Sequence, residues 1–552
     1  MRVGISLALS ALFAQVVCAE VCPTAKSTRQ ANNLEVKSGE TCEITTNKQV
    51  DQKVTNDGTI VFSSSGKISF TNTGMLSVDT NTKGGVIQVK NHATIDASVG
   101  NNLTIEGQDI SIDKNYSLTL KSTNITFGNS SNNKFVTISG DSYVQTSTSY
   151  KNLVLDTTTT LTLKDLSLTN VRMSGSALTT LTNTKLTLNN SYITSDAELA
   201  IKGDTSSTFI VQKDSKNTIS AKKITFNTTN ATHTFQGEGI IDFQAGTITL
   251  GASSQTATLK QGAGDTNKEG AGQTTVGFIA DTQLKAEDLS VEGIKMQVVK
   301  NSEATLSNIK STFKGATLQA LDRDDKDQVL VIENGNSSSP TNAGKITIDL
   351  LSSADTTTTF MGSGIKIYGQ EITINGDSNS NGKSNTLSLQ TIDDSGEITL
   401  GKKNSESTTP PPPAQQNKDG EVTIKGGNNN NKILQLRGAT TTIGGSVTLQ
   451  DLSVQTHSSG EGMVISQGTD GTLTLNNISL TSGIKDEKGA GNYQSLSFTS
   501  EGSGKLDITN GKSSTLSASE FSFTNQNISL ANSGTGSTLT LNAYILVCKR
   551  KF

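Results

Sequence analysis

Short alternating segments dominate the pattern of hydrophobic and polar positions along this chain. In Gly237–Leu259, the segments Ile240–Phe243, Thr247–Leu250 and Thr256–Leu259 each place two apolar side chains one residue apart, with a polar residue between them. A period of two sends the apolar pair to one side of a β-strand and the polar residue to the other. Gly, Ser, Gln and Ala lie between the segments, as expected for turns. The same design runs from about residue 58 to about residue 541.

Such short strands need neighbours, because even a two-stranded hairpin is only marginally stable in water. Stacked coils of chain, in which equivalent segments pair in parallel around a shared interior, give each segment backbone partners on both sides. Three segments in each coil of roughly 20–25 residues predict an all-β fold, a right-handed parallel β-helix with protruding loops. At about 4.8 Å between paired strands, about twenty coils would form a rod on the order of 100 Å long.

Two other folds compete with this prediction. Strands spaced about 8–12 residues apart also occur in tandem β-sandwiches. Sandwich strands are usually longer, however, and this chain has no Trp and only 4% aromatic residues. Disorder would suit the abundance of Ser, Thr, Asn and Gly, but it usually combines low hydrophobicity with high net charge. The net charge here is −4, and the alternation persists throughout.

Composition is consistent with a narrow core. The 552 residues are 32% hydrophobic, which is low for a globular protein but enough for a solenoid whose interior receives two side chains from each segment. Lys and Arg number 46 against 50 Asp and Glu, so the charge predicts no nucleic-acid partner.

Residues 1–19 have the features of a secretory signal peptide. Arg2 supplies the positive charge, Val3–Val17 is an apolar stretch, and Val17-Cys18-Ala19 provides a cleavage site. Cleavage before Cys18, as in a lipoprotein, is the alternative. We therefore expect export through the inner membrane and no transmembrane segment in the mature chain.

Residues 20–57 precede the regular segments and are expected to form an N-terminal cap, because an open solenoid end needs protection against edge-to-edge association. Cys22 and Cys42 lie close in sequence in an exported protein, which predicts a disulfide that closes the first coil. A reactive or metal-bound cysteine pair is the alternative, but the chain has no CxxC motif and no His near these residues. We predict neither a metal nor a cofactor.

Four stretches interrupt the predicted β-helix of residues 58–541 and are expected to protrude as loops. They are Lys260–Thr275, Leu321–Gln328, Asp377–Asn385 and Lys402–Gly420. Four of the six Pro lie in the last loop, so the strands are nearly free of Pro and can donate N–H groups to both neighbours. Residues 542–552 depart from the pattern and are expected to form an irregular tail, too short to span a bilayer as a helix.

A signal peptide followed by hundreds of residues of Ser-, Thr-, Asn- and Gly-rich β-helical segments resembles the passenger region of bacterial autotransporters. The adhesin-like and vacuolating-cytotoxin-like groups are the most similar in style, over about residues 20–541. Family members carry a C-terminal membrane β-barrel that this chain lacks, and a truncated or frame-shifted product would explain the difference. The resemblance implies delivery to the cell surface or secretion, and the missing barrel implies a periplasmic alternative.

Motifs for catalysis are incomplete. Gly140-Asp141-Ser142 and Gly376-Asp377-Ser378 begin the Gly-Asp-Ser-Gly motif of some β-helical serine proteases, but neither continues with Gly. A triad also needs a His within reach of the nucleophile. We interpret all three His as structural or solvated, namely His92, His233 and His457.

One dense carboxylate cluster lies in the loop Leu321–Gln328. Its acidic residues are interleaved with Arg323 and Lys326, so we interpret it as a self-neutralised loop. A calcium site is the alternative, although Lys326 stands where a third ligand would fall and no Gly follows to make the sharp turn. The carboxylates are Asp322, Asp324, Asp325 and Asp327.

The sequence therefore favours a non-enzymatic, exported protein at the cell surface or secreted, which acts in adhesion or host interaction. Its expected partner is a host cell-surface or matrix component. A vacuolating, membrane-active toxin is one alternative. A polysaccharide-active β-helix enzyme, which would need a pair of positioned carboxylates, is the other.

Overall fold

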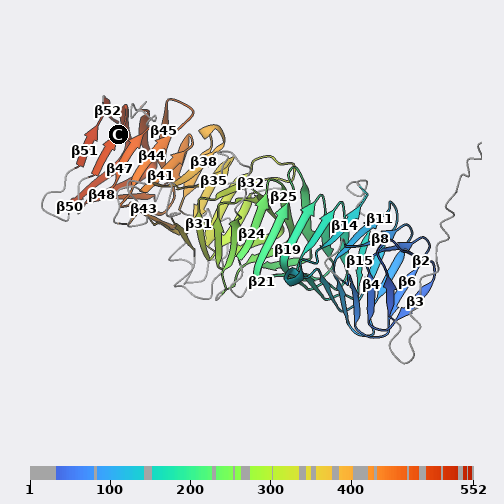
Figure 1. Cartoon of the computed structure of the whole chain (residues 1–552). Helices are drawn as coiled ribbons and strands as arrows, with labels where there is room; N and C mark the ends of the chain where they lie inside the picture. The colour runs from blue at the N-terminus through green and yellow to red at the C-terminus, as the bar shows by residue number, and fades with distance from the viewer. Residues whose placement is uncertain are drawn as a thin grey trace, which may run out of the picture.

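The computed structural model is a long rod of stacked coils, with the first and last coils at opposite ends (Figure 1). The structure describes residues 33–79, 84–141, 152–226, 232–252, 255–262, 274–300, 303–334, 344–349, 356–375, 384–401, 420–427, 432–468, 471–483, 493–510, 514–532, 539–543 and 545–549. The predicted signal peptide of residues 1–19 lies outside these ranges.

Parallel pairing between successive coils builds the whole rod. Leu161 pairs with Leu181, and Leu181 pairs with Ile201, so each of these coils takes twenty residues. The pairings join strands about three positions apart in the chain, which divides the strands into three ladders. Each ladder forms one face of the rod, here called face A, face B and face C in chain order. The predicted parallel β-helix is confirmed.

Face A begins with the first strand of the described chain. Its strands are β1 (Leu34–Val36), β4 (Lys53–Asn56), β7 (Gly74–Ser77), β10 (Asn102–Ile105), β13 (Asn124–Phe127), β16 (Thr160–Leu163), β23 (Lys223–Phe226), β30 (Ala304–Asn308), β33 (Val329–Asn334), β36 (Gly364–Tyr368), β39 (Glu397–Leu400), β42 (Thr440–Ile443), β45 (Gly462–Gln467) and β52 (Ile545–Lys549).

Face B follows face A in each coil. Its strands are β2 (Thr41–Ile44), β5 (Thr59–Phe62), β8 (Gly85–Val89), β11 (Gln108–Ile112), β14 (Val136–Gly140), β17 (Leu166–Thr169), β24 (Thr232–Gly237), β26 (Ala257–Gln261), β28 (Leu289–Glu292), β31 (Lys310–Lys314), β34 (Lys345–Ile348), β37 (Glu371–Ile374), β40 (Glu421–Lys425), β43 (Ser446–Gln450) and β46 (Thr472–Asn476).

Face C completes the coil. Its strands are β3 (Asn47–Val50), β6 (Lys67–Phe70), β9 (Ala93–Asp96), β12 (Leu118–Lys121), β15 (Leu153–Asp156), β18 (Arg172–Gly175), β20 (Tyr192–Ser195), β22 (Lys216–Ser220), β29 (Lys295–Val299), β32 (Thr317–Leu321), β35 (Thr356–Gly362), β38 (Asn385–Thr391), β41 (Lys432–Arg437), β44 (Ser453–His457), β47 (Ser479–Ser482), β49 (Ser514–Ser517) and β51 (Leu539–Asn542).

Some long strands bend through a corner and serve two faces. Faces A and B share β19 (Thr180–Asn189), β21 (Glu198–Val211), β48 (Ser495–Asn510) and β50 (Glu520–Asn532), and faces C and A share β25 (Ile240–Leu250) and β27 (Thr275–Ala286). Two short 3-10 helices, η1 (Ser130–Asn132) and η3 (Ile392–Asp394), lie in connections between strands.

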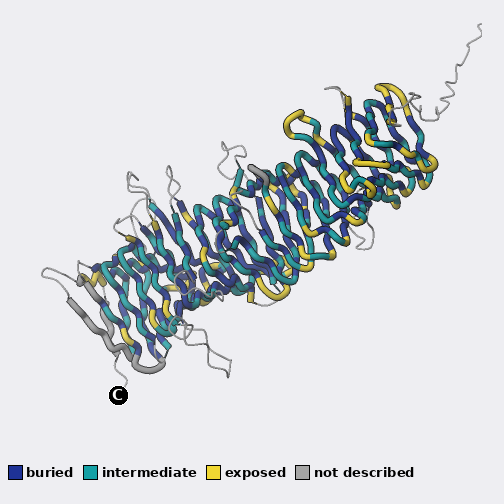
Figure 2. Tube along the Cα trace, turned by 90° about the horizontal axis from the view of Figure 1, so that it is seen from below, coloured by how far each residue is buried: buried dark blue, intermediate teal, exposed yellow. Residues whose placement is uncertain are grey.

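The hydrophobic core is a thin column along the rod axis. Buried residues alternate with partly exposed ones along the coils (Figure 2). In β25, for example, Ile241 and Phe243 are fully buried, whereas Asp242 between them faces outward. The middle coils hold a stack of aromatic rings: Phe209 and Phe235 lie 5.2 Å apart, and Phe243 and Phe278 lie 5.6 Å apart, between ring centroids. Period-two alternation therefore decides burial, as the sequence predicts.

Tight corners between the faces require unusual backbone conformations. At the corner from face B to face C, Asn170, Asn190 and Asn477 have φ values of 54°, 49° and 52°. Asn tolerates this left-handed region better than most residues do. At the corner from face A to face B, Gly251 has φ 79°, and a Cβ there would lie 2.0 Å from the carbonyl oxygen of Asp288 in the next coil.

Insertions leave the register intact. Glu371 of β37 pairs with Thr423 of β40, so residues 376–383 and 402–419 are accommodated without breaking the ladder. Most of three predicted loops, Lys260–Thr275, Asp377–Asn385 and Lys402–Gly420, lies outside the described residues. The fourth, Leu321–Gln328, is described below.

The two ends of the described chain are in register with the rest. Strands β1–β3 pair with the second coil, so the latter part of the predicted cap of residues 20–57 is already a regular coil. Cys42 is buried in β2, whereas Cys22 lies outside the described residues, and their disulfide stays a prediction. The tail of residues 542–552 was expected to be irregular, but it contains β52, which pairs with β50. The open edge of the preceding coil gives this β-branched, apolar run a backbone partner.

Candidate functional site

The corner from face C to face A, here called the C–A corner, carries two hollows and an ion cluster. Face C strands such as β20 and β22 end at this corner, whereas β25 and β27 run through it without a break. Because the coils stack in register, equivalent corner positions align along the rod.

The larger hollow, of about 460 Å³, crosses successive coils of the middle of the rod. Parallel pairing aligns Thr194, Ser220 and Gln244 in three of these coils. The corner residues beside them are small, so aligned coils leave a concavity instead of a ridge. Its lining residues are Arg172, Thr194, Ser195, Asp196, Ser220, Ala221, Lys222, Gln244, Ala245, Gly246 and Asp281.

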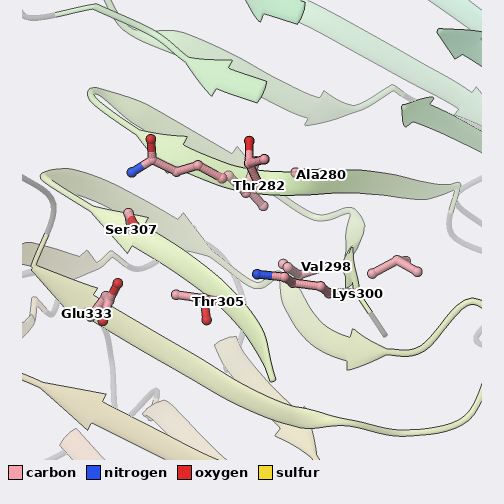
Figure 3. A pocket seen from close by; sticks show the side chains of 10 residues that line it. Ala280, Thr282, Val298, Lys300, Thr305, Ser307 and Glu333 are labelled. Atoms are coloured by element: carbon pink, nitrogen blue, oxygen red, sulfur yellow. The ribbon is translucent and has the colours of Figure 1, made fainter. Parts of the chain in front are cut away.

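The smaller hollow, of about 210 Å³, lies further along the same corner. In Figure 3, Thr305, Ser307 and Glu333 lie on neighbouring strands at one side, and Lys300 extends into the space between Thr282 and Thr305. Its lining residues are Ala280, Thr282, Gln283, Leu284, Val298, Val299, Lys300, Thr305, Ser307 and Glu333.

The two hollows meet at the bend of β27. Asp281 lines the larger hollow, while its neighbours Ala280 and Thr282 line the smaller one. Arg323 donates a hydrogen bond to Asp281 and neutralises it. These two adjacent hollows are together called the corner groove.

Several cations lie along the corner groove. The guanidinium of Arg172 lies 5.4 Å from the ring centroid of Tyr192, a cation–π contact that holds it in place. Among the described residues, the ammonium groups of Lys222 and Lys300 make no ion pair, in contrast to Lys223, which pairs with Glu198 at 3.6 Å. Asp196 also makes no ion pair with a described residue. The groove therefore offers the charges of Lys222, Lys300 and Asp196 to a ligand.

The loop Leu321–Gln328 reaches back over face C from the same corner. The backbone N–H groups of Lys326 and Asp324 donate to Asp322 Oδ1, each at 2.8 Å, and hold the pKa of that carboxyl below its ordinary value. Asp325 lies 3.6 Å from the ammonium of Lys216 in β22. The acidic loop is therefore neutralised partly by earlier coils, through Lys216 and the Arg323–Asp281 pair, and not only by its own cations.

Asp242 lies on face C near this loop and has a perturbed carboxyl. Burial raises its pKa from 3.8 to about 6, the Lys216 ammonium opposes the rise, and the Asp325 carboxylate adds to it. Gly277 occupies the next position in the ladder, and a Cβ there would lie 2.1 Å from Asp242 Oδ1. Glycine thus makes room for the carboxylate.

A partly buried cluster around the Asp394–Arg437 ion pair, here called the ion cluster, occupies the C–A corner near the C-terminal end of the rod. Arg437 Nε and Nη2 donate to the Asp394 carboxylate at 3.1 Å and 2.9 Å, and His457 Nε2 lies 3.4 Å from Asp394 Oδ2. The three residues come from η3 and from the ends of β41 and β44. Asp393 and Asp394 both have positive φ, 51° and 53°, and this conformation turns the carboxylate inward.

All three His that sequence analysis interpreted as structural or solvated lie in the described part. His92 is exposed, with Nδ1 2.9 Å from the Ser117 hydroxyl. His233 is fully buried among Phe side chains, with Nδ1 2.9 Å from the Ser207 hydroxyl, and burial lowers its pKa from 6.5 to about 4. His457 belongs to the ion cluster. Ser142 and the whole of Gly376–Ser378 lie outside the described residues.

The calcium alternative for the acidic loop finds no support in the geometry. Within the described ranges, no group of three or more His, Cys, Asp or Glu is placed to hold a metal ion. None of the helices in the described part is long and apolar enough to cross a membrane.

Sequence reasoning missed the corner groove. Its cations Arg172, Lys222 and Lys300 lie at the edges of the alternating segments, where the period of two carries no information. Only the alignment of coils brings residues that are far apart in sequence to one surface.

Comparison with known proteins adds no relative. The chain matches no model of a protein family, and no curated protein or solved structure is significantly similar to it.

Proposed function

We propose that this chain is an exported, non-enzymatic binding protein of the autotransporter-passenger type, which acts in adhesion or host interaction at the cell surface or after secretion. A host cell-surface or matrix component would be its partner. The proposal combines the resemblance described above with a rigid, parallel β-helical rod.

The corner groove is the observation that carries the proposal. It is an open polar surface that extends over several coils, where a ligand can make many weak contacts with a preformed scaffold. Such extended surfaces are the usual binding sites of solenoid proteins. A preformed site also reduces the entropic cost of binding.

A binding assay with the full mature chain tests this proposal. The fluorescently labelled protein is applied to host epithelial cells and to a panel of immobilised matrix proteins and glycans, with an unrelated β-helical protein as control. Saturable binding to at least one surface is expected. Absence of saturable binding to every surface would contradict the proposal.

Two further readouts distinguish the alternatives. Dye leakage from liposomes at protein concentrations that give no cell binding would favour the membrane-active toxin. Release of reducing ends from polysaccharides would favour the enzyme.

A further inference from the structure

We propose that the corner groove binds an extended anionic polysaccharide. This inference rests on the proposed binding function and specifies its ligand class. Three properties of the groove carry it: its length along the rod, the ammonium groups of Lys222 and Lys300 without an ion pair among the described residues, and the hydrogen-bonding side chains between them.

Length favours a polymer. The two hollows follow the C–A corner from the coil of β18 to that of β33 and meet at Asp281. Lys222 follows β22 and Lys300 follows β29, three steps along the face C ladder, which places their backbones about 14 Å apart at the usual strand spacing. A compact ligand would occupy one hollow, whereas an extended chain can contact both cations.

Charge favours an anion, although the whole chain carries a net charge of −4. Arg172, Lys222 and Lys300 all line the groove. Arg323 already neutralises Asp281, the carboxylate at the junction. Asp196 lines the groove between Arg172 and Lys222, and Glu333 lines it at its last coil, so these carboxylates limit the length over which a polyanion is favoured.

The side chains between the cations suit hydroxyl groups. Hydroxyls and amides line both hollows, including those of Thr194, Ser220, Gln244, Thr305 and Ser307. Each can donate and accept hydrogen bonds, as can a sugar hydroxyl. Nucleic acid is disfavoured, because single strands bind by stacking several bases on aromatic side chains, and no Phe, Tyr or Trp is among the lining residues.

Binding of defined polymers to the full mature chain tests the inference. The probes are polygalacturonate, dextran sulfate and neutral dextran, each measured by biolayer interferometry at 50 and 300 mM NaCl. We expect saturable binding of one or both anionic polymers, weaker at the higher salt concentration because counterions screen the cations, and no binding of dextran. Preference for the carboxylated or the sulfated polymer identifies the anionic group.

The double variant Lys222→Gln/Lys300→Gln tests the site. Loss of the charges of Lys222, which is exposed, and Lys300, which is half-buried, is expected to weaken binding about tenfold, without a change in the thermal unfolding midpoint. Lys202→Gln is the matched control, because Lys202 is an exposed lysine of β21 on face A that lines neither hollow. Its affinity should equal that of the unmodified chain.

The outcomes separate this inference from the proposed function. Equal binding of dextran and the anionic polymers, or an unchanged affinity of the double variant, would overturn the inference. If the chain binds host cells but none of the anionic polymers, the proposed adhesive function is supported and the proposed ligand class is wrong. If the chain binds neither host cells nor any anionic polymer, both the proposed function and the proposed ligand class are contradicted.

Discussion

The C–A corner differs between the middle and the C-terminal coils of the same rod. In the middle coils, the corner positions hold small residues such as Ser195, Ala221 and Ala245, and the surface is hollow. In the C-terminal coils, Asp394, Arg437 and His457 occupy the corresponding corner positions with a partly buried ion cluster. The backbone ladder of face C is continuous through both regions.

This difference shows that corner positions are free to specialise. The strands pair along the ladders and supply the hydrophobic core. Side chains at a corner can therefore either be small and line a binding surface or be large and contact the next coils. A β-helix can therefore place a site on one stretch of an edge and a clamp on another without changing its architecture.

The largest expected effect is on the braced corner. Asp394→Ala removes a buried carboxylate that accepts charge-assisted hydrogen bonds from Arg437, a side chain that is 29% exposed, and their loss costs up to about 3 kcal/mol. We expect a lower denaturant midpoint, measured by circular dichroism. Asp156→Ala is the control, because Asp156 pairs with Lys121 at 2.9 Å and both side chains are more than one third exposed. A change as large as that for Asp394 would show that the brace is ordinary surface pairing.

The next effect concerns Asp242, near the loop. Its folded pKa of about 6 lies above 3.8, so the folded state retains a proton on Asp242 between these values, and the contribution of Asp242 to the stability falls as pH rises through this range. Asp242→Asn should therefore be more stable than the unmodified chain at pH 7 by up to about 3 kcal/mol, and this difference should shrink towards pH 4.

Denaturant unfolding of both proteins from pH 4 to 8 measures this difference. His233 acts in the opposite direction, because its pKa is lowered to about 4 and its contribution is lost as pH falls below 6.5. It is present in both proteins, so it cancels in the comparison. A difference that is independent of pH would contradict the perturbed pKa of Asp242.

Filling the hollow should convert the middle corner towards the braced type. Ser220 faces outward in β22 next to buried Ile219, so Ser220→Trp adds a large side chain to the larger hollow without entering the core. We expect anionic polysaccharide to bind about tenfold more weakly, a loss of about 1.4 kcal/mol, with no change in the unfolding midpoint. Thr187→Trp, on the outer side of face B, is the matched control and should bind normally.

The smallest effect concerns the junction of the two hollows. Arg323→Ala removes a pair whose side chains are both about half exposed, so the stability should change by less than about 1 kcal/mol. The substitution also leaves the Asp281 carboxylate in the groove without its cationic partner. Because this carboxylate then repels an anionic polymer, the affinity should fall about twofold to fivefold. Lys326→Ala, in the same loop, controls for loop composition. Equal affinities of the Arg323→Ala and Lys326→Ala variants would show that Asp281 does not contribute to the binding surface.

Much of the fold could be predicted from the sequence. Alternation in segments such as Ile240–Phe243 identifies the inward residues, and their shortness requires parallel partners in neighbouring coils. The same reasoning failed for residues 542–552, because a continuous apolar run carries no period, and the open edge of the preceding coil recruits it as β52.

The candidate site could not be predicted in the same way. Lys222 and Lys300 are separated by a long stretch of sequence, and their approach depends on the number of coils between them and on the residues in each turn. Likewise, nothing in the local context of His457 indicates that Asp394 and Arg437 lie beside it.

The sequence by itself determined the stacked architecture, because an alternating pattern has one inward and one outward side wherever it occurs in the chain. Only the tertiary structure decided which outward residues meet, through the length of every coil and the turn at every corner. The corner groove, the contacts of the acidic loop with earlier coils and the ion cluster all depend on that alignment, since each joins residues from separate coils.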